Sequence, residues 1–198
     1  MVYLLIFISA VFVNNIVLSQ FLGICPFLGV SQKINTALGM SGAVAFVMTI
    51  SPLVTSLIQK FILVPFQIEY IQTITFILII AFLVQLVEII LKKTAPVLYK
   101  ALGVFLPLIT TNCTILGVAI LVAQGTYIKI EGVEPNLLTG VVFAISSALG
   151  FGLALTIFAG IREQLAMVKL PNAVSGTPIA LITAGLLAMA FMGFAGIV

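Results

Sequence analysis

The sequence contains no histidine, no aspartate and no tryptophan, and only five acidic residues among its 198. The absence of histidine excludes catalysis by an imidazole base and metal sites built on imidazole ligands. Charged residues make up 7% of the chain, whereas about a quarter is usual in soluble domains, so an ordinary soluble domain is excluded. The formal net charge of +3, without a dense basic patch, also argues against nucleic-acid binding.

Long apolar runs dominate what remains, because 63% of the residues are hydrophobic. A membrane-spanning helix needs roughly 20 mainly apolar residues. Six stretches reach that length: Val2–Ile24, Thr36–Ile58, Tyr70–Leu91, Val97–Ala123, Leu137–Ile161 and Pro178–Val198. The sequence therefore predicts an all-α integral membrane protein with six transmembrane helices. They leave no room for a soluble domain, so residues 1–198 are predicted to form a single membrane domain.

The basic residues between these spans predict an orientation. With six spans, one side of the membrane carries Lys33, Lys92, Lys93, Lys100, Arg162 and Lys169, and the other carries Lys60 and Lys129. Short cytoplasmic loops are enriched in lysine and arginine, so the first set is predicted to be cytoplasmic and both termini to lie outside. Chance asymmetry among eight residues is the alternative.

The two cysteines lie in a short internal repeat. Cys25 and Cys113 both begin the pattern Cys-x-x-Leu-Gly-Val, at an offset of 88 residues. This match pairs the first span with the fourth, so that each half holds three spans. Because an odd number of spans reverses the direction of insertion, the sequence predicts two inverted three-helix repeats, approximately residues 1–95 and 96–198. The alternative is a coincidental match between apolar segments.

Helix-breaking residues surround both cysteines. Gly23 and Pro26 flank Cys25, and Pro107 precedes Cys113. A straight helix from the start of the chain would place Cys25 about 35 Å along it, beyond the hydrocarbon core. Inverted symmetry would then place Cys113 near the opposite surface. The two thiols meet only if both helices are broken near the middle of the membrane, so broken helices are predicted at both cysteine segments.

The residues alone leave several roles open for these thiols. They are packing residues, a disulfide, or metal ligands. Zinc and iron–sulfur centres take four ligands, most of them thiolates, and this chain offers two thiolates and no imidazole. A metal centre would therefore require a second chain with two further cysteines. A secondary transporter, suggested by inverted repeats and broken helices, and a passive scaffold are the competing functions.

Three segments carry a resemblance to a known family. They are Phe21–Ser31, Phe105–Cys113 and Ile179–Leu186. With them the chain resembles, over essentially its whole length, the A-type subunits of Rnf electron transport complexes, which are ion-translocating ferredoxin:NAD⁺ oxidoreductases. The sister family, the E-type subunits of the sodium-translocating NADH:quinone oxidoreductase, shares the fold and both cysteine positions. Asn15, Pro26 and Thr111 favour Rnf, because the sister family has an acid in place of Asn15 and no proline after the first cysteine.

The resemblance implies a site and a set of partners. Cys25 and Cys113 would hold half of an intramembrane [2Fe–2S] cluster. The paralogous E-type subunit of the Rnf complex, embedded in the opposite orientation, would supply the other two cysteines. Electrons would enter from ferredoxin through a cytoplasmic iron–sulfur subunit and leave to flavin subunits on the outer side. The chain would be a non-catalytic subunit of a translocase in the bacterial inner membrane, with electron transfer coupled to Na⁺ or H⁺ transport.

Several charged residues in or beside the predicted spans and one glycine segment have simpler interpretations. Glu88 is predicted to pair with Lys92, one helical turn away, rather than to line an ion path. Arg162 is predicted to anchor the fifth span, together with Glu163, at the lipid headgroups. The Gly150-Phe151-Gly152 segment predicts close packing between helices.

Overall fold

The structure is a computed structural model that describes residues 2–66, 69–94, 96, 99–100, 106–126, 137–168 and 176–196. All regular elements within these residues are helical. In chain order they are α1 (Val2–Ile8), η1 (Ser9–Val13), α2 (Ile24–Gly29), α3 (Ile34–Ile58), η2 (Gln59–Leu63), α4 (Val64–Phe66), η3 (Glu69–Ile71), α5 (Gln72–Thr94), α7 (Leu106–Thr110), α8 (Cys113–Gln124), α9 (Leu137–Ala166), α10 (Thr177–Met192) and η4 (Gly193–Gly196).

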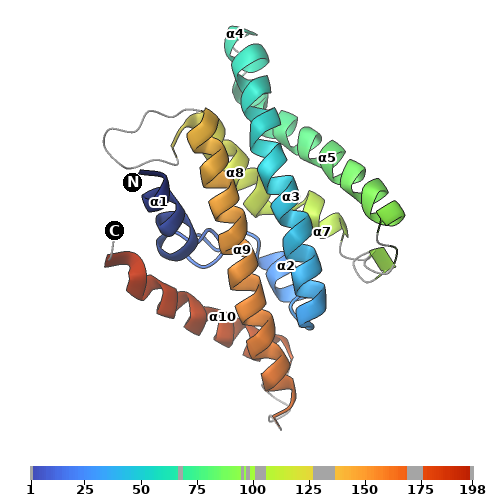
Figure 1. The fold of residues 1–198 in the computed structure, drawn as a ribbon, viewed down its shortest axis with the longest axis vertical. Coiled ribbons are helices and arrows are strands. Elements are labelled where there is room, and N and C mark those ends of the chain that lie inside the picture. Colours follow the sequence, from blue (N-terminus) through green and yellow to red (C-terminus); the bar gives the residue numbers. More distant parts are fainter. Residues whose placement is uncertain are drawn as a thin grey trace.

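Two long helices, α3 and α9, form the centre of the molecule and pack against each other (Figure 1). Helix α1 and the η1 turn contact α9, whereas α5 and α8 contact α3. Helix α10 crosses the other end of α9 and returns toward the N-terminus, so that both chain ends lie near each other in Figure 1. The short helix α2 lies in the middle, beside α3, α7 and α9.

Six full-length spans were predicted, and the described residues contain four helices long and apolar enough to cross a membrane. These are Ile34–Leu63, Gln72–Lys93, Pro107–Gln124 and Leu137–Ala166. The first and last predicted spans contain only the shorter apolar helices Tyr3–Val13 and Thr177–Met192. The first one ends at Val13, and just after it the Asn15 side chain competes for backbone hydrogen bonds by bonding to the Val11 carbonyl and the Val17 amide. The last begins within one residue of the predicted start and ends at Met192, where the 3₁₀ helix η4 follows from Gly193.

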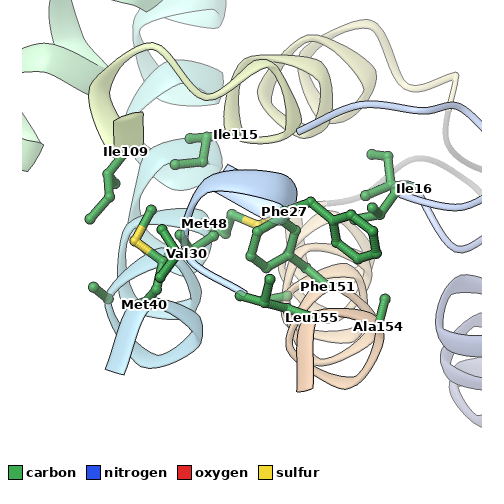
Figure 2. Packing of buried hydrophobic residues seen from close by; sticks show 14 of the residues in the cluster. Ile16, Phe27, Val30, Met40, Met48, Ile109, Ile115, Phe151, Ala154 and Leu155 are labelled. Carbon is green, nitrogen blue, oxygen red and sulfur yellow. The ribbon is translucent and has the colours of Figure 1, made fainter. Parts of the chain in front are cut away.

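Small residues bring the central helices together, as predicted for the Gly-x-Gly segment. A Cβ atom at Gly150 would lie 3.2 Å from the Ala10 carbonyl oxygen and 3.3 Å from Val11 Cα, so α9 passes directly against η1. A Cβ at Gly152 would lie 3.5 Å from Ser41 of α3. The close-packing prediction is confirmed. Figure 2 shows the resulting core, with side chains contributed by α2, α3, α8 and α9.

Glu88 and Arg162 have partners that the sequence did not predict, and the predicted Glu88–Lys92 pair is wrong. Glu88 accepts a hydrogen bond from the Tyr99 hydroxyl at 3.3 Å. No ion pair joins Glu88 to Lys92 in the described part of the chain, where the Lys92 side chain is exposed. Arg162, predicted to anchor the fifth span, donates hydrogen bonds to the Leu28 carbonyl and the Ser31 hydroxyl at the end of α2, a contact that the sequence did not predict. Lys129 and Lys169, used in the orientation prediction, lie outside the described residues.

Candidate metal centre

Both cysteines lie at helix breaks. Residues 14–23 form turns and bends between η1 and α2, and Cys25 is the second residue of α2. The second break separates α7 from α8 at Thr111 and Asn112, and Cys113 is the first residue of α8. The candidate span Pro107–Gln124 therefore contains an interruption directly before its cysteine. The broken helices are where the glycine and proline pattern predicted them.

Local backbone geometry explains each break. Gly23 has a φ of +79° and Phe21 a φ of +53°, both in the left-handed region that glycine tolerates and a bulky residue such as phenylalanine rarely adopts. At the second break, the Asn112 side-chain oxygen accepts a hydrogen bond from the Thr114 amide at 3.0 Å. This is an N-cap, which satisfies one of the free amides at the start of α8.

The segments that carry the two cysteines touch each other. A Cβ atom at Gly23 would overlap the Thr114 hydroxyl oxygen and lie 3.0 Å from the Asn112 side-chain oxygen. A Cβ at Gly117 would lie 2.9 Å from a Leu22 methyl group. The neighbours of Cys25 are thus packed on the neighbours of Cys113. Segments nearly half the chain apart in sequence meet at the two breaks.

Asn15 ties the first break to α9. Its side-chain amide donates to the Gly150 carbonyl at 2.9 Å and to the Val11 carbonyl at 3.1 Å. Its oxygen accepts from the Val17 amide at 3.1 Å. The side chain is buried, so all three bonds lie away from solvent. Asn15 is marked in the sequence both by the family resemblance and as one of a pair of polar residues within an apolar run, but its partner in α9 is not.

Both thiols are free and exposed on the surface of this chain. Across the described residues, no three side chains of the His, Cys, Asp and Glu types gather into a metal site. The metal ligands that this part of the chain offers near the two breaks are therefore the two thiols. An exposed pair suits a centre that a neighbouring chain completes, since buried thiols would be out of its reach.

The surroundings of Cys113 suit an anionic group such as a thiolate-ligated cluster. Cys113 opens a helix of 12 residues, and the positive end of a helix dipole favours negative charge. Two buried polar atoms beside it, Asn112 Nδ2 and Thr114 Oγ1, have no hydrogen-bond partner in the described part of the chain. Uncompensated donors of this kind raise the local positive potential. On these grounds the residues present fit half of an iron–sulfur site.

Comparison with known proteins places the chain in a family. Residues 3–198 match the family described as Rnf-Nqr subunit, membrane protein. The chain is 56% identical over 98% of its length to the A-type subunit of the ion-translocating oxidoreductase complex of Syntrophotalea carbinolica, covering 97% of that protein. It is 55% identical over 99% of its length to the A-type subunit of the Na(+)-translocating ferredoxin:NAD(+) oxidoreductase complex of Acetobacterium woodii, covering 98% of it. The chain therefore belongs to the Rnf-Nqr family of membrane subunits.

Proposed function

We propose that this chain is the A-type membrane subunit of an ion-translocating ferredoxin:NAD⁺ oxidoreductase. In this proposal Cys25 and Cys113 supply two of the four thiolates of a [2Fe–2S] cluster. A paralogous subunit, inserted in the opposite orientation, supplies the other two. The observation that carries the proposal is the contact of Gly23 with Asn112 and Thr114, which brings the two cysteine-bearing breaks together. The names of the relatives support the membership of such a complex.

The residues of this chain have three tasks in the proposal. The Cys25 and Cys113 thiols, exposed at the surface, hold the iron on this side of a subunit interface. Asn112 caps α8 and so keeps Cys113 at the start of that helix. Asn15 keeps the first break folded against α9. The bound cluster supplies one-electron transfer across the middle of the membrane.

The wider setting follows from the same proposal. The chain lies in the bacterial inner membrane with both termini outside, and residues 1–95 and 96–198 form inverted repeats. Its partners are the paralogous E-type subunit, a cytoplasmic iron–sulfur subunit and flavin subunits, and electron transfer is coupled to Na⁺ or H⁺ transport. The pairing of a broken first helix with a broken fourth one supports the inverted arrangement.

Serine substitution of either cysteine tests the site. In the intact complex, Cys25→Ser and Cys113→Ser are each expected to abolish the electron paramagnetic resonance signal of one [2Fe–2S] cluster, because a hydroxyl is a poor ligand for iron. The iron and acid-labile sulfide content of the complex should fall by the amount in one cluster. The matched control is Ile24→Ser, which places a serine at the exposed position beside Cys25. A full signal in either cysteine variant would refute the assignment.

A secondary transporter is the second candidate, because broken helices at membrane depth are typical of ion and solute sites. This function predicts ion flux through the isolated chain in liposomes, with both cysteines dispensable. The redox proposal predicts no such flux from the chain alone. A Cys25→Ser/Cys113→Ser chain that transports ions at the wild-type rate would favour the transporter.

A further inference from the structure

Helix α2 is too short to hold Cys25 in place without help. It has six residues, whereas isolated helices shorter than about 12 residues are marginal in water even with the best helix formers. Its N-terminal neighbour, Gly23, offers no side-chain cap. The position of Cys25 must therefore depend on contacts that α2 makes with other parts of the fold.

Arg162 of α9 binds the C-terminal end of α2. Its Nη1 atom donates to the Leu28 carbonyl oxygen at 2.6 Å and to the Ser31 hydroxyl oxygen at 2.8 Å. Ser31 is fully buried. The last carbonyls of a helix have no partner within the helix, and a cation is favoured at that end. Arg162 thus adds, from a distant part of the sequence, a charged donor to an end of α2 that otherwise has the bond from the Val30 amide to the Pro26 carbonyl.

A pair of aromatic rings reinforces this contact. Phe27 of α2 stacks on Phe158 of α9, with ring centroids 4.2 Å apart and an interplanar angle of 15°. Phe158 precedes Arg162 by one helical turn, and the guanidinium carbon of Arg162 lies 5.8 Å from the centroid of its ring. In Figure 2 the Phe27 ring lies among core side chains of α9. Arg162 and Phe158 therefore hold one face and one end of α2.

The second cysteine segment belongs to a longer helix. Helix α8 has 12 residues and ends at Gly125, whose φ of +68° allows its amide to bond to the Leu121 and Val122 carbonyls. This is a self-contained C-terminal cap. The two cysteine helices therefore differ in length and in partners. Both end in a backbone cap bond, which in α2 joins the Val30 amide to the Pro26 carbonyl at 3.0 Å, but α2 has half the residues of α8 and is bound in addition by Arg162.

We infer that Arg162 is a positioning residue that fixes α2, and with it Cys25, next to the Cys113 segment. The mechanical part of this inference, that Arg162 holds α2 in place, rests on the contacts alone. Its consequence for the cluster rests on the proposed function: loss of the Arg162 charge, close to one ligand helix, is expected to lower the reduction potential of the [2Fe–2S] centre and to broaden its resonance signal.

Spin labelling of the full chain tests the mechanical part without any cluster. A nitroxide is attached to Cys25 in a Cys113→Ser chain, and to Cys113 in a Cys25→Ser chain, both in lipid nanodiscs. Arg162→Met is expected to raise the mobile fraction of the Cys25 spectrum by roughly tenfold, since hydrogen bonds to a charged group contribute about 1.5–3 kcal/mol. The Cys113 spectrum should not change. Arg162→Lys, which keeps the charge and a donor, is expected to restore part of the immobile fraction.

The outcomes separate the two proposals. An unchanged Cys25 spectrum in Arg162→Met, or an equal rise at both cysteines, would overturn the positioning role. Absence of a [2Fe–2S] signal from the wild-type complex would refute the proposed function and leave the spin-label result valid. If Arg162→Met fails to fold, Ser31→Ala, which removes one of the two acceptors, and Phe158→Leu, which removes the stacked ring, are expected to mobilise Cys25 in the same selective way.

Discussion

Replacing Gly23 with alanine is expected to lower the free energy of unfolding by about 2–5 kcal/mol and to separate the two cysteine segments. A φ of +79° costs a non-glycine residue roughly 1–2 kcal/mol. The new methyl group would also overlap the Thr114 hydroxyl and press on the Asn112 side chain. Overpacking of this kind typically costs about 1–3 kcal/mol more. Thermal unfolding in detergent and the cluster content of the assembled complex measure the two effects.

Two further variants isolate the cause. Gly42→Ala is the control, because a Cβ there meets no heavy atom within 4 Å and the residue lies inside α3; it is expected to leave stability unchanged or raise it by about 1 kcal/mol. In Gly23→Ala/Thr114→Ala the overlapping hydroxyl is gone, so the part of the steric loss due to Thr114 should be recovered, whereas the backbone part and the contact with Asn112 should remain. Wild-type stability of Gly23→Ala would show that the two segments do not meet as described.

Asn15→Asp is expected to destabilise the chain by about 3–5 kcal/mol, although it changes a single atom of the side chain. The Asn15 amide donates to the Val11 and Gly150 carbonyls. An aspartate would place a carboxylate oxygen against both carbonyls, and its charge would be buried without a partner. The contact between η1 and α9 at Gly150 should then open, and the first break should lose its anchor.

Asn14→Asp provides the matched control for that change. Asn14 is the adjacent residue, and its amide makes only a long hydrogen bond of 3.4 Å to the Ser9 hydroxyl, at an exposed site. The same chemical substitution there removes no buried hydrogen bond, so it is expected to lower the free energy of unfolding by less than Asn15→Asp does. Chemical unfolding of the two variants in parallel gives the comparison. Equal losses for both would show that the buried hydrogen bonds of Asn15 do not stabilise the fold.

The helices and the site differ in how far the sequence predicts them. The four long helices agree with predicted spans because an apolar run of sufficient length has one stable form in a membrane. The first and last predicted spans contain shorter helices than predicted. Hydropathy alone would continue both, but side-chain hydrogen bonds of Asn15 follow the first and a 3₁₀ helix from Gly193 follows the last. The Glu88–Lys92 pair was predicted from spacing along one helix. In the structure Glu88 instead accepts a hydrogen bond from Tyr99, which comes from a later segment.

The sequence by itself determined the class of the protein and the number of sulfur donors. Hydropathy, the scarcity of charge, two cysteines and no histidine follow from composition, and the helix breaks follow from local backbone preferences of glycine, proline and asparagine. Only the tertiary structure decided which residues support those breaks. Arg162 lies 134 residues from Leu28, and Asn15 lies 135 residues from Gly150. Such contacts arise when helices pack, and no local pattern encodes which side chain will face which carbonyl.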